Sequence, residues 1–265
     1  MPFPETKRVI YKKNPLDRVI CQLRFPAILK IETEVPAKFQ EDIRAEFPEF
    51  KEKQETALPI SKGIQPEVPM EVLRQIVPFS IKNYEFASDD GFWRINLTRT
   101  FLALTCTKYE RRRLFQEKLA CPLKALIETY KPAHFSRIGL RYVDIIRRSV
   151  LGLENVAWKE LLQPHILGLL GTPDDVSQNI QSLEATYEIR LEDGSSIARI
   201  ITGLVEWSET GEKCFMIDTD FFNIGKIATS DVMSKLNYFH IRGSRLIQWL
   251  ITKRLHEAME PEELS

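Results

Sequence analysis

The chain contains two stretches in which strand-like segments are joined by an Asp-Gly turn, and a long helical pattern follows each stretch. The first turn is Asp90-Gly91 and the second is Asp193-Gly194. Asp-Gly between alternating apolar and polar segments is a strong signal for a β-hairpin. The predicted strands around the two turns are residues 80–87, 92–98, 101–108, 184–191, 196–207 and 213–221. A three-strand meander has one apolar face that another element must cover, so the pattern predicts an α+β fold on antiparallel strands.

A long helix is predicted after each meander, over residues 109–130 and 230–259. Both segments carry apolar residues at helical spacing, which predicts one buried stripe on each. Pro122 lies inside the first segment and is expected to kink or divide it. Ser230 is expected to cap the second helix, and Gly243 is a weak position within it.

A strand and a shorter helix are predicted before each meander. These strands are residues 18–25 and 135–146, and the helices are 36–47 and 155–163. Residues 49–79 contain four prolines and are predicted to be irregular, with a short strand near Met70–Ile76.

The same order of elements therefore occurs twice, in residues 18–130 and 135–259 of a single domain spanning 1–265. Joined edge to edge, two such units would form one curved antiparallel sheet with the long helices on one face. This order is similar to the fold of the TATA-box-binding protein, as a topology and not as a function. The alternative is a pair of unrelated α+β lobes.

Charge and apolar runs exclude several classes of protein. Lysine and arginine together number 37, as do aspartate and glutamate, so the formal charge is zero. A neutral chain is not a strongly basic nucleic-acid binder. No apolar run approaches the roughly 20 residues that span a bilayer, and the first residues lack the core of a secretory signal. We therefore expect a cytoplasmic protein without membrane contact.

Cysteines and histidines offer no local metal or redox motif. The cysteines are Cys21, Cys106, Cys121 and Cys214, with no CxxC pair. Three of them sit in apolar, strand-like segments, where cysteine acts as a small hydrophobic residue. The histidines are His134, His165, His240 and His256, without HxxxH spacing. His240 could serve as a general base, but a structural role is favoured. No cofactor is predicted.

The segment RIGLRYVDII carries a candidate binding strip. Side chains alternate along a strand, so Arg137, Gly139 and Arg141 share one face, and Tyr142 and Asp144 share the other. The two arginines would lie about 13 Å apart and could contact successive groups of an extended anion. The favoured alternative is that both are solvated or form cross-strand ion pairs.

Arg111, Arg112 and Arg113 open the first long helix, within a basic region at 108–148. Cations at a helix N-terminus oppose the helix dipole, which suggests a phosphate or an acidic partner there. Residues 108–148 hold 11 basic and four acidic residues, whereas residues 183–220 hold nine acidic and three basic ones. Internal charge complementarity, or head-to-tail association of two chains, is the favoured explanation.

Asp218 and Asp220 form a DxD pair on a predicted strand. The two-residue period places both carboxylates on one face, where they could hold Mg²⁺ for phosphoryl chemistry. The alternative is the exposed end of a strand.

Three segments resemble a sporadically distributed bacterial family of about this length. They are NPLDRVICQLRFP, FLALTCTKYERRRLFQEKL with RIGLRYVDII, and ITKRLHEAMEP. The resemblance covers nearly the whole chain and implies no catalytic residues, because the family has no established activity. It implies an accessory gene of the kind found on mobile elements and in phage-defence islands.

The favoured function is non-catalytic binding of a protein partner through the open face of the sheet. The first alternative is RNA or DNA binding through residues 108–148, with Arg111–Arg113 as contacts. The second is a Mg²⁺-dependent phosphodiesterase that uses Asp218 and Asp220. The sequence makes no prediction about oligomeric state.

Overall fold

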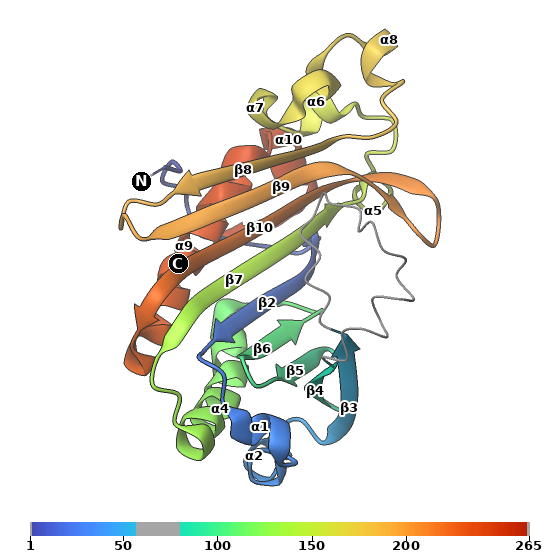
Figure 1. Ribbon diagram of the computed structural model, residues 1–265. Coiled ribbons are helices and arrows are strands. Elements are labelled where there is room, and N and C mark those ends of the chain that lie inside the picture. The colour runs from blue at the N-terminus through green and yellow to red at the C-terminus, as the bar shows by residue number, and fades with distance from the viewer. Residues whose placement is uncertain (1, 57–79, 264–265) are drawn as a thin grey trace, which may run out of the picture.

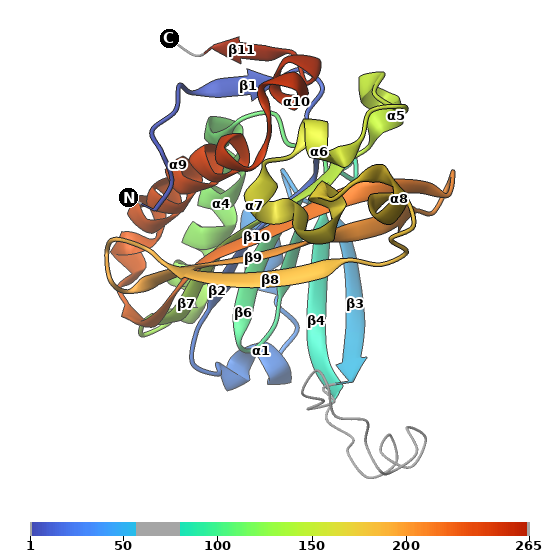
Figure 2. The same ribbon diagram turned by 90° about the horizontal axis from the view of Figure 1, so that it is seen from above.

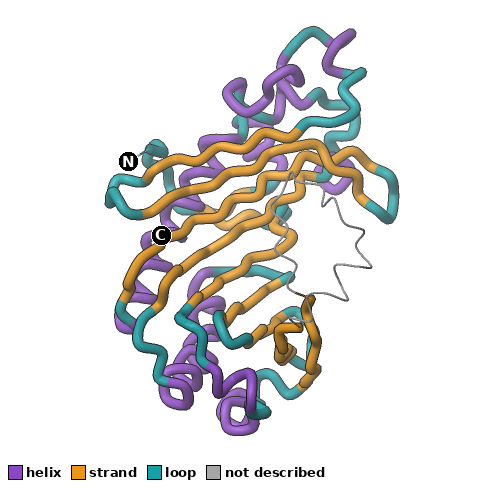
Figure 3. The backbone as a smooth tube through the Cα atoms, in the orientation of Figure 1, coloured by secondary structure: helices purple, strands orange, loops and turns teal. Residues whose placement is uncertain are grey.

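Nine antiparallel strands form one open, twisted sheet in a computed structural model that describes residues 2–56 and 80–263 (Figure 1). The strand order is β3-β4-β5-β6-β2-β7-β10-β9-β8. These strands are β2 (Leu16–Arg24), β3 (Glu49–Thr56), β4 (Ser80–Ala87), β5 (Trp93–Leu97), β6 (Phe101–Cys106), β7 (Phe135–Ile146), β8 (Glu184–Arg190), β9 (Ser196–Trp207) and β10 (Glu212–Ile227). The expected α+β class with a large antiparallel sheet is confirmed, and Figure 3 shows the strands as one curved layer.

Two 19-residue helices, α4 (Arg112–Tyr130) and α9 (Val232–Leu250), lie on the same side of the sheet (Figure 2). The shorter helices are α1 (Leu29–Thr33), α2 (Ala37–Ile43), α5 (Arg148–Leu151), α6 (Trp158–Leu161), α7 (Pro164–Leu167), α8 (Asp174–Ser177) and α10 (Lys253–Ala258). Among the described residues, no helix crosses the opposite face of β2, β7, β10 and β9, which we call the uncovered face. The short α5 reaches only its margin, where Val150 and Leu151 lie near Ile145.

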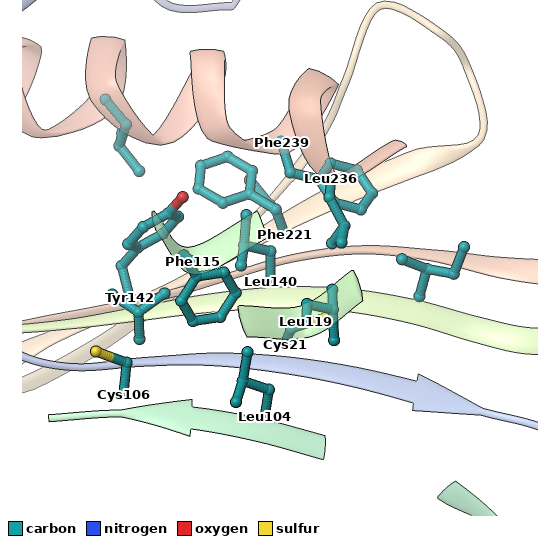
Figure 4. Packing of buried hydrophobic residues seen from close by; sticks show 14 of the residues in the cluster. Cys21, Leu104, Cys106, Phe115, Leu119, Leu140, Tyr142, Phe221, Leu236 and Phe239 are labelled. Atoms are coloured by element: carbon teal, nitrogen blue, oxygen red, sulfur yellow. The ribbon is translucent and has the colours of Figure 1, made fainter. Parts of the chain in front are cut away.

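The core lies between the sheet and the two long helices. Figure 4 shows Phe115 and Leu119 of α4, and Leu236 and Phe239 of α9, packed with inward-facing residues of the strands that include Cys21, Leu140 and Phe221. Alternate residues of β2, including Cys21, are fully buried there. Cys106 and Cys214 are also buried, which confirms the structural interpretation of these three thiols.

Both predicted Asp-Gly turns are present. Asp90-Gly91 joins β4 to β5, and Asp193-Gly194 joins β8 to β9. Gly91 and Gly194 have φ values of +71° and +69°, a left-handed conformation that costs glycine little.

The prediction that residues 49–79 are irregular was wrong for the first residues of that range. Glu49–Thr56 is strand β3, which pairs with β4 over eight residues at the edge of the sheet. Its side chains are mostly charged, and its Phe50 is 38% exposed, so the sequence lacks the apolar alternation of a half-buried strand. The strand predicted near Met70–Ile76 lies outside the described residues.

The long helices also differ from the prediction. α4 runs through Pro122 without division, and the Pro122 ring is buried between the helix and its neighbours. The second predicted helix is two helices, because Ile251 is extended and the Thr252 hydroxyl accepts a hydrogen bond from the Leu255 amide to start α10. Asp231, not Ser230, precedes α9, and no side chain caps it.

A small second sheet joins the two ends of the described chain. β1 (Val9–Tyr11) pairs with β11 (Pro261–Glu263). This pairing holds the N-terminal segment against the C-terminal helices, and the Tyr11 hydroxyl lies 2.8 Å from Nδ1 of His256 in α10. No helix in the described ranges combines the length and the apolar character needed to cross a bilayer.

Candidate functional site

The predicted arginine strip and the predicted acidic pair lie together on the uncovered face. β7 and β10 are neighbouring antiparallel strands, and Arg141 is directly opposite Asp220. Arg137 Nη2 lies 2.6 Å from Asp220 Oδ2, and Arg141 Nε lies 2.7 Å from Asp218 Oδ1. The two sets of residues, considered separately in the sequence, therefore form two cross-strand ion pairs.

These pairs change the chemistry open to each group. Hydrogen bonding to Asp218 raises the pKa of Arg141, whereas burial lowers the pKa of Arg137. Each carboxylate already accepts hydrogen bonds from a guanidinium, which neutralises the charge that would attract a cation. Within the described part of the chain, no three His, Cys, Asp or Glu side chains are grouped as metal ligands.

Gly139 gives Arg137 the space it occupies. A Cβ at Gly139 would overlap the guanidinium of Arg137, which therefore lies over the glycine. From there it also stacks on Phe222, with 4.8 Å between Cζ and the ring centroid. The side chain of Arg137 is only 16% exposed, so it is part of a packed surface rather than a free cation.

Apolar side chains surround these ion pairs on the uncovered face. The strand registers place there Ile20, Phe101, Ala103, Val143, Ile197, Ile201, Phe222 and Ile224. Ile224 is 67% exposed. The same registers also place Arg18, Gln22, Arg24, Thr105 and Arg199 on this face. Apolar and polar residues are therefore mixed on it, whereas a sheet face in contact with water alone is mainly polar.

Arg111, Arg112 and Arg113 lie elsewhere, at the N-terminus of α4 on the helix-covered side of the sheet. Arg137 and Arg141 are on the opposite side. The basic region at 108–148 is therefore not one continuous surface.

The three arginines line a cavity of about 330 Å³, which no local sequence pattern predicts. It lies between the N-terminal segment, the start of α4, strands β7 and β10, and helix α9. Its walls include Ile10, Leu16, Ile217, Phe221, Leu246 and Ile247, together with Tyr11, Tyr109 and Tyr142. Arg8 and Glu110 join the arginines of α4 in the lining.

His240 of α9 reaches the cavity and is paired with a buried tyrosine. The Tyr142 hydroxyl lies 3.0 Å from His240 Nδ1. Burial and the nearby charges of Arg112 and Arg8 lower the pKa of His240 to about 4, so the imidazole is neutral at pH 7. Burial raises the pKa of Tyr142 well above its usual value. The protonated hydroxyl can therefore donate to Nδ1.

Asp144 is the most unusual group in the cavity. It is 6% exposed, and no hydrogen bond or ion pair joins its carboxyl group to any described residue. Burial, and to a lesser extent the charge of Asp218, raises its pKa to about 7. A buried carboxyl without a partner is costly to a fold, and such groups occur disproportionately at functional sites.

One sequence signal could have pointed to Asp144. In RIGLRYVDII it falls on the strand face that carries Ile138, Leu140 and Ile146, which are buried. An acid on the apolar face of a strand needs a partner or a role. The cavity itself could not have been predicted, because its walls come from segments more than 200 residues apart.

Comparison with known proteins gives no further assignment, because neither a protein-family model nor a curated protein matches this chain.

Proposed function

We propose that this protein is a non-catalytic binding protein whose protein partner docks on the uncovered face of the sheet. The observation that carries the proposal is the composition of that face, where aliphatic and aromatic residues surround the ion-paired Arg137 and Arg141. Interfaces between proteins are enriched in aromatic residues and arginine, and unpaired acids are rare at their centres. The partner surface that fits is apolar at its centre, with polar groups toward its rim.

The ion pairs favour a protein over a nucleic acid on this face. Nucleic-acid binding draws its affinity from cations that replace counterions around phosphates. Arg137 and Arg141 are engaged by Asp220 and Asp218, so a phosphate would have to displace a carboxylate from each. The same pairing leaves Asp218 and Asp220 poorly suited to Mg²⁺, and we derive no phosphodiesterase step from them.

We also infer that the sheet consists of two equivalent halves, as in the TATA-box-binding protein. The strand order supports this inference. On one side of the centre the order is β2-β6-β5-β4, and on the other it is β7-β10-β9-β8. β2 and β7 meet antiparallel at the centre, and each half ends in a long helix on the same face. Such a sheet curves away from its helices and leaves one broad surface for a partner.

A pair of variants with matched exposure tests the docking surface. Ile224 on the uncovered face is 67% exposed, and Leu169, which follows α7, is 63% exposed. Ile224→Glu and Leu169→Glu therefore introduce the same charge at equally solvated positions. The tagged proteins are used to capture partners from lysate of the source cells, with and without nuclease, and bound proteins are identified by mass spectrometry.

We expect a protein that the wild type and Leu169→Glu retain after nuclease treatment and that Ile224→Glu loses. Recovery of nucleic acid alone, or equal capture by both variants, would contradict the proposal. The accessory role in phage defence that the resemblance implies is a separate prediction, which the identity of the captured protein would test.

A further inference from the structure

The cavity beside α9 has chemistry that the proposed docking surface does not use. It lies on the helix-covered side of the sheet, and its volume of about 330 Å³ is at the lower end of the range for small-molecule sites, roughly 300–1,000 Å³. Most of the area of its walls is apolar or aromatic, although about half of its lining residues are polar or charged. That combination is typical of a site for one small ligand.

The mouth of the cavity is suited to an anion, because Arg8 and the three arginines of α4 outnumber Glu110 in its lining. Arg111 is the N-cap residue of α4, no side chain caps that helix, and its first turn contains no acid. The first amide groups of a helix lack intrahelical partners and carry a partial positive charge. Arg8, from the N-terminal segment, lines the same cavity, and neither Arg8 nor Arg111 has an ion-pair partner among the described residues. Arg113 is paired with Glu117 in the next turn.

The interior of the cavity is suited to a hydrogen-bond donor. Asp144 is 94% buried, lines the cavity, and has no described partner. When ionised, this carboxylate can only accept hydrogen bonds, so its complement is a ligand group with N–H or O–H donors. The rings of Tyr109, Tyr142 and Phe221 lie in the same walls, and aromatic side chains of this kind stack on planar rings.

We propose that the cavity binds a mononucleotide, with its phosphate at the N-terminus of α4 near Arg8 and Arg111 and with donor groups of its base toward Asp144. The arrangement also explains the three consecutive arginines at the start of α4, whose mutual repulsion a bound phosphate would offset. Among the common bases, guanine presents two adjacent N–H donors that match the two oxygens of a carboxylate. Uracil presents one N–H between two carbonyl oxygens, which a carboxylate repels. The site is therefore expected to prefer GMP to UMP.

Calorimetric titration of the full chain with GMP, UMP, guanosine and inorganic phosphate tests the proposal. Asp144→Asn keeps the shape of the side chain but replaces one acceptor by a donor. We expect it to weaken GMP binding by about tenfold or more, the effect of losing a hydrogen bond to a charged group. Arg111→Gln should weaken GMP binding by a similar factor and leave guanosine binding unchanged.

Arg44→Gln is the matched control, because Arg44 forms a surface ion pair with Glu41 on α2, away from the cavity. It should bind GMP as the wild type does. The far-ultraviolet circular dichroism of each variant shows whether it is folded. The proposal is overturned if GMP does not bind at millimolar concentration, if UMP binds as tightly as GMP, or if folded Asp144→Asn binds GMP as the wild type does. The proposal is equally overturned if inorganic phosphate is the one compound of the four that binds, since the base would then play no part.

Discussion

Replacing Asp144 by asparagine removes an ionisable group from the protein interior while preserving its shape. In the folded protein the pKa of Asp144 is about 7, against 3.8 for an ordinary aspartate. The folded state therefore binds this proton more tightly than the unfolded state does. Below about pH 4 both states are protonated and the site costs nothing. As the pH rises toward 7 the unfolded state ionises first, so the stability contributed by the protonated site is lost.

The magnitude follows from that difference in pKa. Above pH 7 the ionised, buried carboxylate costs about 4 kcal/mol of folding free energy, as an order of magnitude. An asparagine amide at the same place is also buried without a partner, which costs roughly 1–3 kcal/mol. We therefore expect Asp144→Asn to be about 1–3 kcal/mol more stable than the wild type at pH 8. At pH 4 the ionisation penalty is absent and the cost of the amide remains, so the variant should be about 1–3 kcal/mol less stable than the wild type.

Urea unfolding followed by tryptophan fluorescence measures both values, since the chain contains four tryptophans. The quantity of interest is the difference between variant and wild type at each pH, because other titrating groups cancel in it. Asp89→Asn, at an exposed turn position, is the control and should change stability by less than about 0.5 kcal/mol throughout. A difference for Asp144→Asn that does not vary with pH, or a variant less stable than the wild type at pH 8, would refute the reasoning.

Three further changes have defined outcomes in the same unfolding assay. Gly243→Ala should destabilise the protein by about 1–3 kcal/mol, because its Cβ would lie 2.9 Å from Tyr142 Cε2. Helix propensity alone predicts the opposite, a gain in stability of about 1 kcal/mol. Such a gain would show that the Tyr142 ring moves aside freely. Arg137→Gln should cost roughly 1–2 kcal/mol at pH 7, because it leaves Asp220 without its guanidinium partner; no measurable loss would mean that the ion pair contributes nothing to stability. His240 has its pKa lowered to about 4 in the folded state, so the stability that its neutral form contributes should be lost as the pH falls from 6.5 toward 4, against the gain from Asp144. His240→Gln should lose less over that interval, and an unchanged slope would contradict the assignment.

Local signals in the sequence predicted most of the fold. The Asp-Gly turns fix a left-handed glycine at Gly91 and Gly194, and alternation along β7 placed Arg137 and Arg141 on one face. The errors arose where tertiary contacts decide the structure. Glu49–Thr56 is a strand because β4 offers a free edge for pairing, which its own charged residues do not reveal.

The candidate sites were less accessible to sequence reasoning. The residues Arg137, Arg141, Asp218 and Asp220 were all identified, but their pairing depends on the register between β7 and β10. Asp144 received no role, because an isolated acid in an apolar strand gains meaning only when the surrounding cavity is known.

Site-specific photo-crosslinking tests the docking of a protein on the uncovered face most directly. A photoreactive amino acid at position 224 lies on that face, and the same group at position 124, on the exposed side of α4, is the control. After irradiation in source-cell lysate treated with nuclease, we expect one protein to be linked through position 224 and none through position 124. Equal crosslinking at both positions, or none at position 224, would contradict the account.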